Sequence, residues 1–350
     1  MKKLPHFLLF LQLFIFSVKS SPCKELYDLE SAAQNFVLET KKIEIPGYPH
    51  AFNPGIIRWQ GRLLMSFRII ADSKQSFNTE IGLIFLDENF CPVGKPQLLN
   101  LRDEYSISPC RAEDARLITL DDRLYMVYDD NIEFKISKGG FRIYVAEIYY
   151  DGEHFIADPI ECLKSFENES RNVREKSWVP FEYQGNLLLA YSLLPHLIFY
   201  PRLDGTGICD TVASTESSIS WRWGILRGGT PGLIEKEGYL AFFHSSIEMA
   251  TVHSSGKKMA HYFIGAYLFS HQPPFAILKI SPEPIIGKNF YKGTHYKPYW
   301  KPIRCVFPCG YISDDKHIWL TYGRDDHEAW VVKLDKKGLL QSLVSCSPGI

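Results

Sequence analysis

Hydrophobic positions in this chain fall mostly in short runs of strand length, and helical spacing is scarce. Five segments share one layout: an apolar strand, a polar two-residue turn, and a second apolar strand that ends at or beside an aromatic residue or a histidine. These segments span residues 54–68, 116–130, 178–192, 231–245 and 310–323. Further strands are predicted over residues 80–86, 141–150, 262–269 and 330–334. The pattern therefore predicts an all-β protein.

A hairpin that recurs at long intervals is typical of a β-propeller, in which each blade is a small twisted sheet that must pack against its neighbours. Five copies predict a five-bladed β-propeller. A pair of β-sandwiches is the main alternative, but it does not require one hairpin repeated five times with polar residues at matching places. No stretch resembles a linker, so we expect a single propeller domain over residues 22–350. It begins with a short helical or irregular extension, in which a helix over 29–40 is capped by Asp28.

The first 21 residues have the features of a secretory signal peptide. A basic start, Met1-Lys2-Lys3, precedes an apolar run over 7–18, and small serines follow that run. The run is too short to span a bilayer comfortably. We therefore predict an exported protein, secreted, periplasmic or in the lumen of the secretory pathway, with no membrane attachment once residues 1–21 are removed. An uncleaved signal anchor is the alternative.

Composition narrows the function further. The net charge of −1 provides no basic footprint for nucleic acid, so no nucleic-acid partner is expected. The aromatic content of 14% suits either strands or a surface that faces carbohydrate. Eight cysteines permit disulfides in an exported chain, but no cysteine or histidine spacing predicts a metal site. The oligomeric state stays open.

The innermost strands of a propeller converge on a central channel, so polar residues next to the five hairpins should meet at one axial site. These residues are Asn53 and Arg68; Glu113, Asp114 and Arg116; Glu175, Lys176, Trp178 and His196; Arg227 and His244; and Arg324, Asp325, Asp326 and His327. Carboxylates beside cations suit cleavage of a glycosidic bond, which needs a proton on the leaving oxygen and stabilisation of an oxocarbenium-like centre. The cations suit phosphate or a sugar phosphate, and an aromatic such as Trp178 can stack on a sugar face.

Each of these residues also has a purely structural explanation. An Asp-Arg cluster can be a salt bridge that fixes its loop, Gly228-Gly229 can be a tight turn, and His244 can be a core imidazole. Loop fixing does not require polar residues at equivalent places in five repeats, so their recurrence favours a shared site.

At these residues the sequence resembles glycoside hydrolase family 130, the five-bladed β-mannoside phosphorylases and their hydrolytic relatives. The resemblance runs from about residue 53 to 334. EDAR at 113–116 is similar to the family's E-D-P-R motif, with Ala115 in place of the proline. The other matching stretches are Asn53-Pro54 with Arg68, EKSWVPF at 175–181 followed by Pro195-His196, RGGTP at 227–231, FPCG at 307–310 and YGRDD at 322–326.

The resemblance implies an inverting enzyme that acts on β-mannosides, with Asp114 as the general acid. In the phosphorylases this acid passes its proton through a sugar hydroxyl while phosphate attacks the anomeric carbon. Inorganic phosphate is then a co-substrate, and no other cofactor is expected. If water attacks instead, Asp325 or Asp326 is the candidate base, at ~6.5–9.5 Å from the acid.

Residues and resemblance together give a complete set of expected roles. Asp114 and Asp326 are the expected catalytic residues. Lys176 and His196 stand where the family carries a pair of arginines for phosphate, and they are the expected phosphate-binding residues. The expected substrate contacts are Asn53, Arg68, Glu113, Arg116, Trp178, Arg227, His244 and Asp325.

Two other functions fit the same sequence. A glycosyltransferase of the secretory pathway would use Lys176, His196 and Arg227 to hold the phosphate of an activated sugar donor. A non-catalytic propeller would bind a glycan without cleaving it, because fold does not fix function. All three readings share an oligosaccharide or glycan partner.

Overall fold

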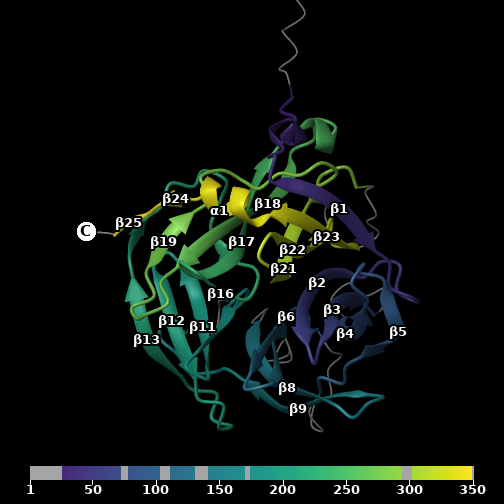
Figure 1. Ribbon diagram of the computed structural model, residues 1–350, viewed down its shortest axis with the longest axis vertical. Coiled ribbons are helices and arrows are strands. Elements are labelled where there is room, and N and C mark those ends of the chain that lie inside the picture. The colour runs from purple at the N-terminus through teal and green to yellow at the C-terminus, as the bar shows by residue number, and fades with distance from the viewer. Residues whose placement is uncertain are drawn as a thin grey trace, which may run out of the picture.

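A computed structural model gives the structure of the protein, and it describes residues 26–71, 78–102, 111–130, 141–169, 174–293 and 302–348. The predicted signal peptide, residues 1–21, lies outside the described residues. Among the described residues, strands dominate the regular secondary structure, and the sheets surround a common centre in a propeller-like arrangement (Figure 1). The predicted all-β class is therefore confirmed.

Four sheets are regular four-stranded antiparallel blades. Their strands are β2 (Phe52–Trp59), β3 (Arg62–Ile70), β4 (Thr79–Leu86) and β5 (Pro92–Leu98) in blade one; β6 (Glu113–Leu120), β7 (Arg123–Asp130), β8 (Arg142–Tyr150) and β9 (Phe155–Cys162) in blade two; β10 (Val179–Tyr183), β11 (Asn186–Leu193), β12 (His196–Pro201) and β13 (Cys209–Thr215) in blade three; and β21 (Val306–Ser313), β22 (His317–Arg324), β23 (Glu328–Asp335) and β1 (Val37–Ile43) in the closing blade.

The expected count of five equivalent blades is wrong, because the described chain forms four such blades and one larger sheet. The larger sheet follows blade three along the chain and is called the fourth sheet here. It has seven strands: β15 (Arg227–Gly228), β16 (Leu233–Glu235), β17 (Gly238–Met249), β18 (Met259–Phe269), β19 (Ile277–Ile280), β20 (Ile303–Arg304) and β24 (Val344–Ser345). Strands β17 and β18 have 12 and 11 residues, so they extend beyond a normal hairpin and pair with additional strands. The inner position is divided into β15 and β16 by a segment that contains Pro231, which has no backbone N–H.

All five predicted hairpins are present as antiparallel pairs. The turns of the first three are tight, and both residues of each turn have positive φ, as a two-residue turn that matches the twist of the strands requires. Asp121 and Asp122 adopt φ values of 46° and 64° without being glycine, which aspartate tolerates better than most residues.

The two ends of the chain join sheets far from them in sequence. β1 pairs with β23, so the first strand completes the closing blade and ties the start of the ring to its end (Figure 1). At the other terminus, β24 pairs with β19, and β25 (Ser347–Pro348) pairs with β14 (Ser217–Ser218). These long-range pairings fix the ring because neither end can leave without breaking a sheet.

Helices are few and short in the described part of the chain: η1 (Leu29–Ala32), η3 (Val252–Ser254) and α1 (Lys336–Ser342). The predicted helix over 29–40 is reduced to η1, although Asp28 does cap it by accepting a hydrogen bond from the Glu30 N–H at 3.0 Å. From Val37 onward the backbone pairs with β23 instead, because that pairing completes a sheet. None of the described helices has the length and apolar character needed to cross a membrane.

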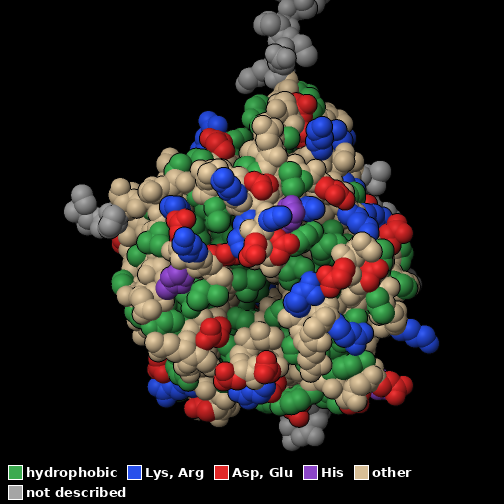
Figure 2. All heavy atoms as spheres, in the orientation of Figure 1, with side chains coloured by type: hydrophobic (Ala, Val, Ile, Leu, Met, Phe, Trp, Pro, Cys, Tyr) green, Lys and Arg blue, Asp and Glu red, His purple; other side chains and the backbone are tan. Residues whose placement is uncertain are grey.

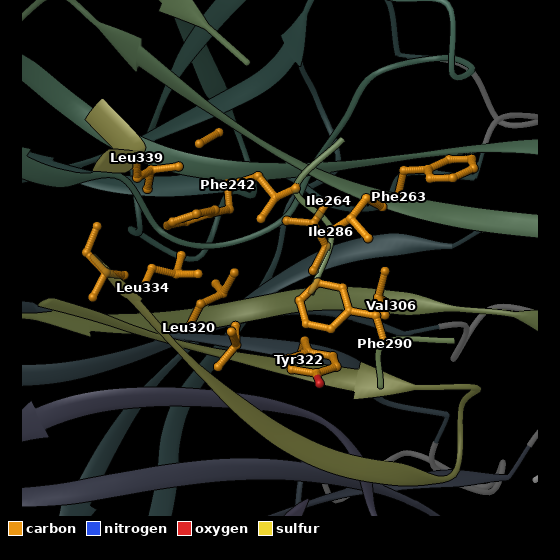
Figure 3. Close-up of a cluster of buried hydrophobic side chains, with 14 of the residues drawn as sticks. Phe242, Phe263, Ile264, Ile286, Phe290, Val306, Leu320, Tyr322, Leu334 and Leu339 are labelled. Carbon is orange, nitrogen blue, oxygen red and sulfur yellow. The ribbon is translucent and has the colours of Figure 1, made fainter. Parts of the chain in front are cut away.

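Hydrophobic side chains fill the spaces between neighbouring sheets. The largest cluster lies between the fourth sheet and the closing blade, where Phe242 and Ile264 face Leu320 and Tyr322, and Leu339 of α1 covers one end (Figure 3). The face shown in Figure 2 carries charges of both signs around a central hollow, with no extended patch of one sign on that face among the described residues. This mixed surface agrees with the net charge of −1.

Candidate active site

A cavity of about 600 Å³ opens where the inner strands of the sheets converge. β2 packs between β21 and β6, and β6 packs against β10, so residues at the same end of these strands reach one space. The cavity is lined by Asn53, Arg68, Arg111, Glu113, Asp114, Phe141, Arg174, Lys176, Ser177, Ile225, Arg227, His244, Ser245, Ser246, Tyr262, Cys305, Phe307 and Asp326. The structure thus brings together residues from every sheet of the ring.

The inner strands deliver these side chains through a repeated backbone feature. In β2 and in β6 the strand register shifts immediately after the first residue, and Asn53 and Asp114, at the second position, have φ values of 47° and 55°. Ser177, just before β10, has a φ of 66°. A bulge with a left-handed residue re-aims the side chain at that point. Asn53, Asp114 and Ser177 all line the cavity.

Asp114 is held by groups from two blades. Its Oδ1 accepts a hydrogen bond from Asn53 Nδ2 at 2.7 Å and another from Arg68 Nη1 at 3.2 Å. Burial alone would raise the pKa of Asp114, but the charges of Arg68, Lys176 and Arg116, with the Asn53 hydrogen bond, hold that pKa below its ordinary value. The carboxylate is therefore ionised at neutral pH.

Glu113 and Lys176 extend this network toward blade three. Arg68 Nη2 lies 2.7 Å from Glu113 Oε1, and Lys176 forms an ion pair with the other oxygen of Glu113. Burial would lower the pKa of Lys176, but the neighbouring carboxylates raise it, so the ammonium group stays charged. The two cations therefore bind Glu113 from opposite sides.

Asp129, which the sequence analysis missed, lies behind this pair. It is fully buried, it pairs directly across from Glu113 in the β6–β7 ladder, and its Oδ2 is 3.3 Å from Lys176 Nζ. Burial raises the pKa of Asp129 to about 7, and the nearby carboxylates add to that effect while Lys176 opposes it. A signal was present in the sequence: Asp129 follows its hairpin turn at the same spacing as Arg68 follows the turn of blade one.

His244 occupies in the fourth sheet the position that Asp129 occupies in blade two, and it lies opposite Arg227 in the β15–β17 ladder. Its Nδ1 donates a hydrogen bond to the Gly228 carbonyl at 2.8 Å, so Nε2 carries no proton and can only accept. Burial, together with the charge of Arg116, lowers the pKa of His244 to about 3. The imidazole is thus neutral at physiological pH, and it packs on Phe307 with 4.4 Å between ring centroids.

Two further cations, Arg111 and Arg174, line the cavity although the sequence analysis did not single them out. Each lies just upstream of a recognised motif: Arg111 precedes Glu113 by two residues, and Arg174 precedes Lys176 by two residues. That shared spacing was the available signal. Asp326 and Arg227 line the cavity as expected.

Four residues with expected roles do not line the cavity. His196 belongs to β12, the third strand from the axis, and its buried ring packs against Phe269 while Nδ1 donates to the Phe275 carbonyl at 2.7 Å. Burial lowers the pKa of His196 to about 4, so it is not a cation for phosphate. Trp178 is 1% exposed and packs edge-on against Phe166, which leaves no face for a sugar.

The other two residues that do not line the cavity, Asp325 and Arg116, have structural roles. Asp325 accepts from Arg304 Nη1 at 2.8 Å through Oδ2 and from the Cys305 N–H at 2.9 Å through Oδ1, so both of its oxygens serve the backbone and a buried ion pair. Arg116 is fully buried and donates to the carbonyls of Asp114 and Gly229, which ties blade two to the fourth sheet. These contacts hold both side chains within the protein, and neither side chain lines the cavity.

Among the described residues, Glu113, Asp114 and Asp129 come close enough to share a cation, with one oxygen of each within 4.8 Å of the others. Arg68 and Lys176 already supply positive charge at this place. The cluster is thus an ion-pair network of three carboxylates and two cations, built into the wall of the cavity.

The fold is an all-β ring of sheets, and its axial cavity holds carboxylates and several cations. This arrangement is suited to protonating a glycosidic bond and to binding phosphate. The sequence profile of the family described as beta-1,4-mannooligosaccharide phosphorylase matches residues 24–343. The chain therefore belongs to this family, glycoside hydrolase family 130, and the resemblance found in the sequence is confirmed. Members of the family are glycoside phosphorylases and glycoside hydrolases, so the chain is an enzyme of that class. No curated protein sequence matches it.

Solved structures share the fold at low sequence identity. A β-1,2-mannobiose phosphorylase from Listeria innocua, solved with β-1,2-mannobiose, has a TM-score of 0.57 at 17% identity, with 89% of this chain and 95% of that chain covered. A glycosyl hydrolase from Bacteroides ovatus has a TM-score of 0.57 at 16% identity, with coverage of 93% and 96%. A mannose phosphorylase from Leishmania mexicana, solved with phosphate ion, has a TM-score of 0.52 at 13% identity, with coverage of 91% and 94%.

Proposed function

We propose that this enzyme cleaves β-mannosides with inversion, using Asp114 as the acid and inorganic phosphate as the attacking group. The observation that carries the proposal is the charge of the cavity wall. Five cations (Arg68, Arg111, Arg174, Lys176 and Arg227) face the cavity together with three carboxylates (Glu113, Asp114 and Asp326), although the whole chain has a net charge of −1. A surplus of cations beside an acid suits an anionic second reactant.

The charge state of Asp114 supports a role for phosphate in loading the acid. Arg68 and Lys176 keep this carboxylate ionised, whereas an acid must carry a proton. Phosphate bound to the same cations would bring negative charge close to Asp114 and draw Arg68 away from it. Both effects raise the pKa of Asp114, so binding of the co-substrate would prepare the acid for proton transfer.

Hydrolysis is the second candidate, and Asp326 is the observation that favours it. This carboxylate lines the cavity from the closing blade, and it can serve as the base that activates water. Asp325 cannot take that role because both of its oxygens accept structural hydrogen bonds.

The substrate in this proposal is a mannose-containing glycan. The family description names β-1,4-linked mannooligosaccharides, and the relative from Listeria innocua acts on a β-1,2-linked disaccharide. Both linkages therefore belong in the assay. Export with removal of residues 1–21 is part of the same proposal and rests on the apolar run over 7–18; a mature protein that begins near residue 22 supports it, and a mature protein that retains Met1 contradicts the cleavage and favours a signal anchor.

The test is sugar release from β-1,4- and β-1,2-mannobiose, with and without phosphate, by the wild type and by Asp114→Asn. Asp121→Asn is the matched control, because Asp121 lies exposed in the turn at the far end of the same hairpin. Mannose 1-phosphate formed only with phosphate, and lost in Asp114→Asn alone, supports phosphorolysis. Free mannose regardless of phosphate assigns a hydrolase, and no release of either product overturns the proposal.

A further inference from the structure

A second cavity of about 430 Å³ adjoins the catalytic one between blade three and the fourth sheet. The two cavities share Arg174, Lys176, Ile225 and Arg227 in their walls. The remaining lining is different in character, because it is mainly apolar and aromatic and includes Trp221, Leu226 and Tyr191. The second cavity is therefore a continuation of the catalytic cavity with its own chemistry.

Ile225 and Trp221 make the apolar side of this space. Ile225 stands on the shared rim with 77% of its surface exposed, the largest exposure of any bulky hydrophobic residue described. Trp221 is held in place, since its indole N–H donates to Ser245 Oγ at 2.9 Å and its ring meets Phe243 edge-on with 4.9 Å between centroids. A fixed indole beside an exposed aliphatic side chain forms a rigid apolar wall.

Glu175 makes the polar side. Its side chain is 2% exposed and hydrogen-bonds Trp178, yet its Oε1 has no hydrogen-bond partner. A buried carboxylate oxygen without a partner is costly unless a ligand hydroxyl donates to it. Trp178 thus acts as a support that orients Glu175, which explains why the indole is buried.

We propose that this second cavity binds one further neutral sugar unit of the oligosaccharide, next to the unit that is cleaved at Asp114. A pyranose has an apolar face, which fits against Trp221 and Ile225, and hydroxyls, which can donate to Glu175 and accept from Arg227. The choice of occupant rests on the shared wall, since Arg174, Lys176, Ile225 and Arg227 line both cavities and an oligosaccharide longer than the first cavity can extend past them. The carboxylate of Glu175 disfavours an anion at this place. The inference rests on the proposed function for the identity of the sugar.

Binding separates this inference from the proposed function, because it needs no turnover. The Asp114→Asn protein is titrated calorimetrically with mannobiose and mannotriose of the β-1,4 and β-1,2 series. We expect mannotriose of one series to bind about tenfold more tightly than its mannobiose, a gain typical of one additional well-packed apolar contact. In the same background, Trp221→Phe and Ile225→Ala should reduce that ratio to about twofold or less.

Ile234→Ala is the matched control, because Ile234 is 69% exposed on β16 and lines neither cavity. It should leave the ratio unchanged. Equal affinity for mannobiose and mannotriose in both series, or a ratio that Trp221→Phe and Ile225→Ala do not alter, overturns the inference even if the wild type cleaves mannosides. A chain-length effect that both variants abolish, in an enzyme that releases no product, sustains this subsite and defeats the proposed reaction.

Discussion

Asp129 and Glu113 lie directly opposite each other in the β6–β7 ladder, and Lys176 forms ion pairs with both. The same ladder position holds Arg68 opposite Phe52 in blade one and His244 opposite Arg227 in the fourth sheet. Three sheets thus present a basic, an acidic and a neutral polar residue at one structurally equivalent place. The site uses one backbone arrangement and varies its chemistry by side chain.

Asp129→Asn should change how stability depends on pH. The pKa of Asp129 is about 7 in the folded protein against an ordinary value of 3.8, so folding binds a proton between these values. The resulting stabilisation is complete below about pH 4 and is lost as the pH rises through 7. The wild type therefore loses stability, on the order of 2 kcal/mol, between pH 5 and pH 8, and the asparagine variant lacks this loss. Urea unfolding of both proteins at pH 5 and pH 8 measures the change in the free energy of unfolding. The same change in the wild type and in Asp129→Asn would contradict the prediction.

Gly323→Ala should impair catalysis through Asn53. A Cβ at position 323 would overlap with Asn53 Oδ1 and lie 2.8 Å from the Asn53 backbone nitrogen, so Asn53 must move. Asn53 donates the 2.7 Å hydrogen bond that positions the Asp114 carboxyl group, and misplacing a catalytic group in this way costs about 2 kcal/mol, or roughly 30-fold in kcat/KM.

A double-mutant cycle checks the cause of that loss. Asn53→Gly removes the same hydrogen bond while tolerating the left-handed backbone at position 53. In this background, Gly323→Ala should cost little more. Full additivity of the two effects would show that Gly323 acts by another route.

Arg227→Ala should weaken phosphate binding more than sugar binding. Arg227 lines the cavity and is exposed, so its removal leaves no buried carboxylate without a partner. We expect the KM for phosphate to rise about tenfold, as one contact to an anion is lost. Arg222→Ala is the control, since Arg222 lies in the same loop, is exposed, pairs with Glu283 and does not line the cavity. An equal rise in the KM for phosphate in both variants would show that Arg227 attracts phosphate only from a distance and makes no direct contact with it.

Arg116→Lys should destabilise the fold although Arg116 belongs to the motif that carries the acid. The guanidinium group is fully buried and bonds the carbonyls of Asp114 and Gly229, and an ammonium group cannot reproduce that two-sided geometry. We expect a loss of about 3 kcal/mol in the free energy of unfolding. Denaturant unfolding measures it, with Arg123→Lys on the exposed turn side of β7 as control. A change below about 1 kcal/mol would contradict this structural role.

The sequence determined the hairpins, their turns and the motif around Asp114. These features are local: alternating apolar positions specify a strand, and a two-residue polar turn specifies where it reverses. Asp114, Lys176, Arg227 and Asp326 could be selected because each lies beside such a hairpin, and the cavity contains all four.

Tertiary structure alone decided which polar side chains face the cavity and how many regular blades surround it. His196 and Asp325 resemble site residues in sequence but are turned into the core or an ion pair, whereas Asp129, Arg111 and Arg174 contribute charge although their spacing from a turn or motif is too weak a signal to select them alone. The seven-stranded fourth sheet depends on β20 and β24, which pair with strands distant in sequence. The physical reason is the same in each case: the direction of a side chain and the partner of a strand edge depend on bulges and on packing between segments far apart in the chain, which local periodicity does not encode.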